Sequence, residues 1–135
     1  MAQTKTAKRK PAKRASAAKA TIRIKRVYDA PASDDGLRVL IDRLWPRGVT
    51  KERAHLDEWA RELAPSTELR RWFGHDPSRF QEFRRRYTKE LAAHADKLSE
   101  LRSRARTGTL TVVYSARDTQ HNDAVVIAEI LRRPS

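Results

Sequence analysis

The stretch from Arg38 to Gly48, RVLIDRLWPRG, constrains the fold more than any other part of this 135-residue chain. Its first half, Val39 to Ile41, is an apolar run without polar alternation, which is typical of a strand covered on both faces. The second half cannot extend that strand easily, because Pro46 has no backbone donor and Gly48 permits a turn. In α/β domains, binding sites are often built where such an apolar run changes abruptly to charged and aromatic residues.

The rest of the chain alternates between strand-like and helix-like patterns. Strands are predicted at Thr21–Tyr28, Leu37–Ile41 and Thr109–Tyr114. Helices are predicted from Lys51 to Leu63 after a Thr50 cap, from Ser66 to Phe73, from Asp76 to Ala105 with a break near His94, and from about Gln120 to Arg132. This alternation predicts an α/β fold with a small, mainly parallel three-stranded sheet packed by several helices.

Residues 1–20 differ from the rest in composition. The formal net charge of the chain is +13, and this segment contains seven Lys or Arg residues and no acid. It has no large apolar side chain after Met1, so we expect a disordered tail followed by a single α/β domain over residues 21–135. A solvated basic arm can contact nucleic-acid phosphates without sequence preference, and the residues expected to do so are Lys8, Arg9, Lys10, Lys13 and Arg14. The alternative is a tail that only improves solubility.

The composition also excludes several classes of protein. The chain has no cysteine, which rules out disulfides, thiolate catalysis and cysteine-ligated metal centres. It has no apolar run near the roughly 18 residues needed to span a bilayer, and no secretory signal pattern. We therefore expect a cytoplasmic protein without membrane contact. No ligand spacing predicts a metal site, and no glycine-rich phosphate loop predicts a cofactor.

The first group of candidate site residues follows the second predicted strand. Arg43 and Arg47 flank Trp45 there, and Asp42 precedes them. Two guanidiniums beside an indole suit a carboxylate or phosphate next to a flat group. The structural alternative is that Asp42 pairs with an arginine, that Trp45 belongs to the core, and that the Pro/Gly segment is only a turn.

The second group follows the third predicted strand, in the segment Tyr114–Asn122, YSARDTQHN. Its candidate ligand-binding residues are Ser115, Arg117 and Asn122. Free amides at the start of the following helix favour anions, and Arg117 adds a full charge. The alternative is that Asp118 or Thr119 is only the helix N-cap. Since both groups follow strands that are expected to be parallel, they can meet at one edge of the sheet and form an anion-binding pocket.

Catalysis is a weaker hypothesis. A Ser115 nucleophile with His121 as its base can be drawn, but there is no glycine-flanked nucleophile elbow. Asp42, Asp118 and His121 are the candidate proton-transfer residues. Neither an enzymatic activity nor an oligomeric state follows from the sequence.

Several blocks in the same order carry a family resemblance. They are Arg38–Gly48, Leu63–Thr67 (LAPST), Trp72–Pro77 (WFGHDP), Phe83–Tyr87 (FRRRY) and Tyr114–Asn122. Together they resemble the domain of unknown function 488 family in its YeaO-like branch, over about Ile22 to Leu131. The resemblance implies a small cytoplasmic α/β protein and no reaction. Other branches of the family have cysteines, so a thiol or metal chemistry does not transfer to this chain.

Two functional hypotheses follow. The first is a domain that binds an anionic small molecule, such as a phosphate, nucleotide or carboxylate, where the second and third strands end. The second is a nucleic-acid-associated or regulatory module that uses the basic tail.

Overall fold

A computed structural model describes residues 21–133 of the chain. The predictions made for residues 1–20, including the basic arm, lie outside this range. Within it, one parallel sheet contains β1 (Thr21–Arg26), β2 (Leu37–Leu40), β3 (Glu58–Trp59) and β4 (Thr109–Tyr114) in the order β1-β4-β2-β3. The α/β class and the parallel sheet are confirmed. The prediction of three strands is wrong, because β3 adds a fourth strand beside β2.

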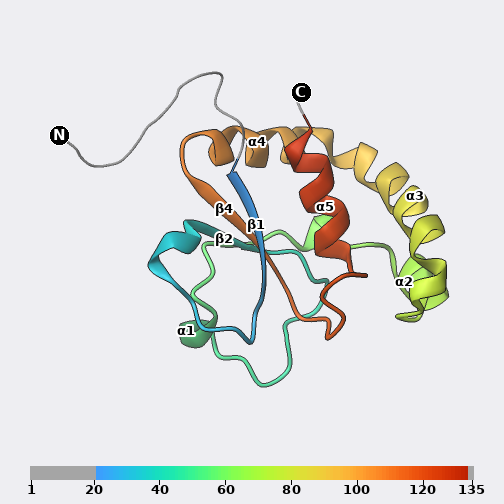
Figure 1. Cartoon of the computed structure of the whole chain (residues 1–135), viewed down its shortest axis with the longest axis horizontal. Coiled ribbons are helices and arrows are strands. Elements are labelled where there is room, and N and C mark those ends of the chain that lie inside the picture. The colour runs from blue at the N-terminus through green and yellow to red at the C-terminus, as the bar shows by residue number, and fades with distance from the viewer. Residues whose placement is uncertain (1–20, 134–135) are drawn as a thin grey trace.

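Five α-helices cover residues between and after the strands in the described range. They are α1 (Lys51–Ala54), α2 (Thr67–Phe73), α3 (Phe80–Leu91), α4 (Ala95–Arg106) and α5 (Asp123–Arg132). As predicted, the Ser66 hydroxyl caps α2, and Gly74 ends it in the left-handed conformation. A 3₁₀ turn at Ala92–His94 separates α3 from α4, where the sequence predicts a break. In Figure 1, α5 lies beside β1 and β4, while α4 runs along the top of the view and α3 down its right side.

The segment predicted as one helix from Lys51 to Leu63 is the main local error. Helix α1 ends at Ala54, because His55 adopts a left-handed conformation with φ 47°, and β3 follows it. The apolar residues that mimic a helical stripe are divided between two cores. Leu56 and Trp59 pack into one core, whereas Ala60 and Leu63 pack into the other. One face of a helix cannot supply both sides of a sheet.

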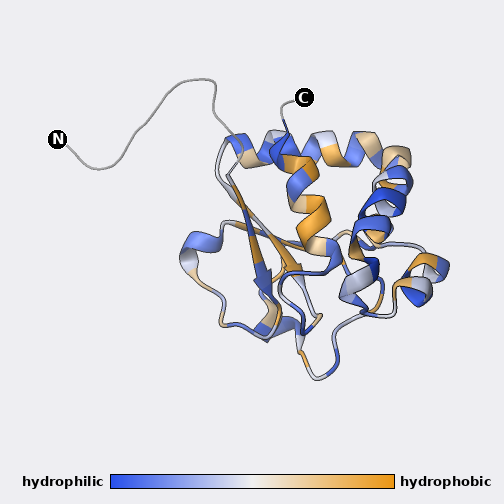
Figure 2. Ribbon diagram, turned by 45° about the vertical axis from the view of Figure 1, so that its right-hand side comes forward, coloured by the Kyte–Doolittle hydropathy of each residue, from blue (hydrophilic) through white to orange (hydrophobic). Residues whose placement is uncertain are grey.

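The sheet is buried on both faces, because successive residues of a strand point to opposite sides. Val39 packs into the larger core under α2 to α5, and Leu40 packs into the smaller core with Val27, Ala54 and Val113. Trp45 and Trp59 border this smaller core. In Figure 2 the strands and α5 carry much of the hydrophobic colouring. The unbroken apolar run of β2 therefore has the two-sided burial that its sequence predicts.

Gly36 positions β2 against β4. Its φ is 64°, and a Cβ at this position would lie 2.1 Å from the backbone oxygen of Thr109. The chain therefore passes directly beside the start of β4, which fixes the pairing of Leu37 with Leu110 and of Leu40 with Val113. None of the helices within residues 21–133 has the length and apolar character needed to cross a membrane.

Candidate functional site

Two loops leave the same edge of the sheet, because β2 and β4 are neighbouring parallel strands. We call residues 41–50 the β2–α1 loop and residues 115–122 the β4–α5 loop. Together with residues of α2 and α3 they enclose a cavity of about 360 Å³. Its charged and polar lining residues are Asp42, Arg43, Arg47, Arg70, His75, Ser115, His121, Asn122 and Asp123. Its aromatic lining residues are Tyr28, Trp45, Phe73 and Phe83.

Three side-chain donors fix the β2–α1 loop. The Trp59 indole donates to the Asp42 carbonyl at 2.7 Å, the Trp45 indole donates to the Val49 carbonyl at 2.6 Å, and the Tyr28 hydroxyl donates to the Arg47 carbonyl at 3.0 Å. The Trp45 and Trp59 rings also meet edge to face, with centroids 5.4 Å apart. Trp45 therefore packs against the smaller core and also lines the cavity. It has both the structural position and the position in the candidate site that the sequence left as alternatives.

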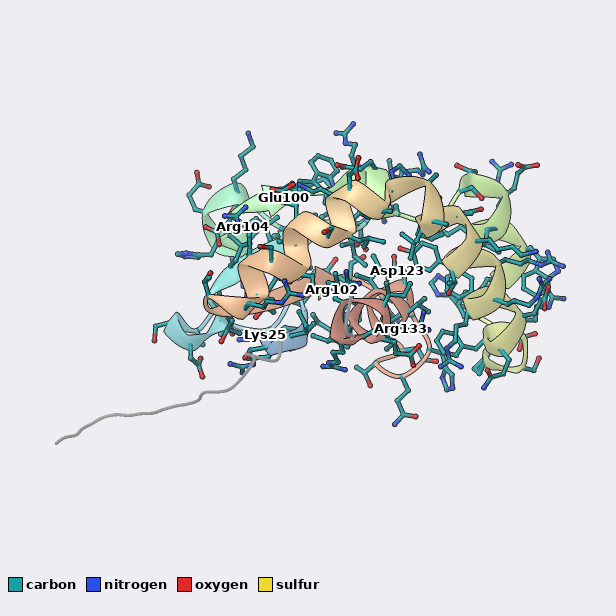
Figure 3. All side chains as sticks on the ribbon, turned by 90° about the horizontal axis from the view of Figure 1, so that it is seen from above. Lys25, Glu100, Arg102, Arg104, Asp123 and Arg133 are labelled. Carbon is teal, nitrogen blue, oxygen red and sulfur yellow. The ribbon has the colours of Figure 1, made fainter. Side chains whose placement is uncertain are left out.

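The two loops are joined inside the cavity by Ser115, whose hydroxyl donates to the Asp42 carboxylate. Burial raises the pKa of Asp42, although the hydrogen bonds from Ser115 and the positive charge of Arg70 oppose this rise. Burial and the negative charge of Asp42 also raise the pKa of Asp123 to about 7, against the effects of the Ala124 amide and Arg70. Figure 3 places Asp123 beside α5, on the side toward α3. The inner cavity therefore holds two poorly solvated carboxyl groups.

The cavity arginines are exposed and largely without partners. Arg43 donates to the Pro65 carbonyl at 3.3 Å. Within residues 21–133, the guanidiniums of Arg47 and Arg70 form neither an ion pair nor a hydrogen bond with a protein group. By contrast, the consecutive arginines of α3 all pair with carboxylates, on Glu82 or Glu129. The cavity thus offers guanidinium donors that the fold itself does not use.

His121 is held by Asp118 rather than by Ser115. Its Nδ1 lies 3.0 Å from the Asp118 carboxylate, and its ring meets Phe80 edge to face at 5.2 Å. The Asp118 carboxylate also accepts from the backbone amides of Gln120 and His121. The hydrogen bond from the Gln120 amide is the largest cause of the lowered pKa of Asp118. Across the described residues there is no hydrogen bond between Ser115 and His121, so the drawn nucleophile–base pair is not assembled.

Asn122 lines the cavity but has a structural task. Its side chain is buried, with the residue 2% exposed, and its oxygen accepts from the Val125 amide at 3.0 Å as the N-cap of α5. Its amide nitrogen donates to the Asp118 carbonyl at 2.8 Å. The interpretation of Asp118 or Thr119 as the cap is therefore wrong, because the loop continues through a turn closed by Asp118 before α5 begins.

We expect Asn122→Ala to lower the free energy of unfolding by about 1–2 kcal/mol, because it removes a helix cap and leaves the partly buried Asp118 carbonyl without this donor. Urea denaturation of the variant measures this loss. Thr119→Ala is the matched control, since Thr119 is exposed and does not cap α5. Equal stability of the Asn122 variant and the wild type would contradict this role.

The structure brings together most of the predicted site residues. Arg43, Trp45, Arg47, Ser115 and Asn122 line one cavity, as do Asp42 and His121. Arg117 is exposed and does not line it, and Asp118 lies behind His121.

Among the charged and polar lining residues, sequence reasoning missed three as members of this site: Arg70, His75 and Asp123. A local signal exists only for Asp123, which directly follows the asparagine that begins the helix after β4. Arg70 and His75 come from the long connection between β2 and β4, and their place depends on how that connection folds back over the sheet.

Comparisons with known proteins place the chain in a family. The family model described as the inactive DUF488-N3 subclade matches residues 21–134. The chain is similar to the uncharacterized protein YeaO of Escherichia coli strain K12, with 46% identity over 82% of this chain and 96% of that protein. It is also similar to the uncharacterized protein Rv3073c of Mycobacterium tuberculosis strain H37Rv, with 42% identity over 82% of this chain and 92% of that protein. No solved structure gives a significant match.

The matched residues cover β1 to α5, and with them both loops of the cavity. The chain therefore belongs to the domain of unknown function 488 family, in its YeaO-like branch.

Proposed function

We propose that the protein binds a small anionic molecule, such as a phosphate ester, nucleotide or carboxylate, in the cavity between the β2–α1 loop and the β4–α5 loop. The observation that carries this proposal is the pair of exposed guanidiniums of Arg47 and Arg70, which line one cavity and form no hydrogen bond or ion pair with a protein group in residues 21–133. Guanidinium groups bind phosphate and carboxylate strongly through charge-assisted hydrogen bonds.

Binding is favoured over catalysis by two observations. The Ser115 hydroxyl donates to the Asp42 carboxylate and forms no hydrogen bond with His121 within residues 21–133, so a serine–histidine pair of the kind that activates a nucleophile is not assembled. The matching subclade is also described as inactive. The cavity volume of about 360 Å³ lies within the range of small-molecule sites.

A thermal-shift screen with phosphates, nucleotides and carboxylates tests the proposal. A ligand present at about 100 times its Kd stabilises the folded protein by about 2.7 kcal/mol, which raises the Tm by several degrees. We expect Arg47→Ala to weaken the binding of such a ligand about tenfold or more, because a charge-assisted contact is lost. The Tm of the variant without ligand should match that of the wild type, since the exposed Arg47 side chain forms no hydrogen bond or ion pair within residues 21–133.

Arg117→Ala is the matched control for this experiment. Arg117 is also an exposed arginine near the same edge of the sheet, but it does not line the cavity. We expect its removal to leave the ligand-induced shift unchanged. A ligand whose binding is weakened equally by both substitutions would be responding to general positive charge, and the proposed site would be wrong.

A further inference from the structure

The cavity separates its charges by depth. Arg43, Arg47 and Arg70 are exposed, whereas Asp42 and Asp123 are half-buried and face the interior beside Ser115. We propose that the ligand carries a hydrogen-bond donor, either a hydroxyl or an ammonium group, at the end opposite its anionic group. This inference rests on the proposed anion site and specifies the class of molecule that the site takes.

The inner carboxyl groups select against a simple anion. In its ionised form, each of Asp42 and Asp123 raises the cost of a further negative charge nearby, and Coulomb energies are larger where solvent is partly excluded. Their oxygens are hydrogen-bond acceptors, and an ionised carboxylate has about four acceptor positions. Within the fold, the Asp42 carboxyl group accepts a hydrogen bond from the Ser115 hydroxyl, and the Asp123 carboxyl group accepts one from the Ala124 amide. Positions therefore remain for a donor from a ligand.

Arg70 couples the two ends of the cavity. Its positive charge lowers the pKa of both Asp42 and Asp123, so it partly offsets their negative charge. An anion bound to Arg70 neutralises that charge and leaves the two carboxyl groups with less compensation. A donor at the other end of the same ligand restores the compensation, and an ammonium group does so more fully than a hydroxyl group. An anion without a donor leaves the two carboxyl groups uncompensated.

The walls between the two ends suit a carbon skeleton. Phe73 and Phe83 belong to the larger core and also line the cavity. Their rings stack with centroids 4.4 Å apart, which gives a rigid apolar surface. The space also exceeds what an inorganic phosphate ion fills. A hydroxylated or aminated alkyl phosphate therefore matches the acidic interior, the apolar wall and the exposed arginines together.

Three probes with the same four-carbon chain test this inference: butyl phosphate, 4-hydroxybutyl phosphate and 4-aminobutyl phosphate. Their affinities are measured by NMR titration of the full-length chain, which detects millimolar binding. We expect one or both of the donor-bearing probes to bind about tenfold more tightly than butyl phosphate, the difference made by one hydrogen bond to a charged acceptor. A larger gain for the amine identifies an ammonium group as the donor. An equal gain for both probes shows that the hydrogen bond is recognised and that a positive charge on the donor adds nothing to the affinity.

The variants Asp123→Asn and Asp42→Asn test whether the tighter binding of the donor-bearing probes depends on the inner carboxyl groups. Each substitution keeps the side-chain shape and removes the charge, and we expect at least one of them to reduce the advantage of the donor-bearing probes severalfold. Butyl phosphate binding as tightly as both other probes would overturn the inference and leave the anion site standing. An advantage that survives in both variants would also overturn it. Failure of all three probes to bind would overturn the inference that the site takes an alkyl phosphate bearing a donor, while the thermal-shift screen decides the proposed function separately.

Discussion

Arg38→Met is expected to lower the free energy of unfolding by about 3–5 kcal/mol, the usual loss when one partner of a buried ion pair is removed. Arg38 is 3% exposed and Asp35 is 0% exposed, and the guanidinium donates to the Asp35 carboxylate at 2.6 Å. Burial alone would raise the pKa of Asp35, but hydrogen bonds from the Ala32 amide, Lys25 and Arg38 hold that pKa below its ordinary value. Without Arg38, a buried carboxylate loses its closest positive charge.

Arg38 also joins β2 to the end of α1. Its guanidinium donates to the carbonyl oxygens of Ala54 and His55, at 2.9–3.1 Å. These oxygens belong to the turn where α1 stops and the chain passes toward β3. Removing the guanidinium leaves the Ala54 carbonyl buried without a donor, which adds to the loss. Methionine fills most of the volume, so the measured change reports on charge and hydrogen bonding rather than on a cavity.

Urea denaturation at pH 7 measures the effect, and Arg53→Met is the matched control. Arg53 lies on α1, is exposed and forms no ion pair in the described residues. The folded pKa of Asp35 lies below its unfolded value of 3.8, so its ionised form stabilises the protein above about pH 4. The difference between wild type and variant should therefore shrink as the pH falls below this value. If the free energy of unfolding at pH 7 fell by no more than about 0.5 kcal/mol, the range of surface substitutions, the stabilising role of the buried Arg38–Asp35 ion pair would be contradicted.

The parts of the fold that the sequence predicts are those with local causes. Ser66 and Gly74 bound α2 because a hydroxyl can accept from a backbone amide and glycine tolerates a left-handed conformation. The apolar run of β2 predicts burial on both faces. By contrast, β3 has two residues and exists because it pairs with the edge of β2, at Val39–Glu58 and Leu40–Trp59. No pattern within so short a segment distinguishes it from a helical turn.

The candidate site divides in the same way. Adjacent parallel strands bring their following loops together, and this rule alone places Arg47 and Ser115 at one cavity. The direction of each side chain depends on contacts made elsewhere. Arg117 and Asp118 are consecutive in the chain. Asp118 nevertheless orients His121, whereas Arg117 is exposed and does not line the cavity. The prediction that Arg117 shares a pocket with Arg47 depends on the direction of the Arg117 side chain, which the sequence does not determine.

Asp123→Asn is expected to stabilise the protein at neutral and alkaline pH. Burial and the nearby charge of Asp42 raise the pKa of Asp123 from 3.8 to about 7, so the folded state favours the protonated carboxyl group. A group whose pKa is higher in the folded state stabilises the protein fully below its unfolded pKa, and this stabilisation is lost as the pH rises through the folded pKa. The shift corresponds to at most about 4 kcal/mol.

The pH dependence separates this effect from a general change in packing. At about pH 4 both wild type and variant hold a neutral side chain at position 123, so their free energies of unfolding should agree closely. Between about pH 4 and pH 8 the wild type should lose stability relative to the variant, by on the order of 2 kcal/mol once the partial solvent access of this half-buried side chain is allowed for. Urea denaturation at four pH values across this range measures the difference.

Asp96→Asn provides the control, because Asp96 is an exposed carboxylate near the start of another helix, α4. Its removal should give no comparable rise in relative stability between pH 4 and pH 8. A difference for the Asp123 variant that stays constant with pH would show that this carboxyl group is well solvated in the folded protein. The inner end of the cavity would then lack the uncompensated charge on which its preference for a donor-bearing ligand depends. The stability measurement thus tests the electrostatics of the site without any ligand.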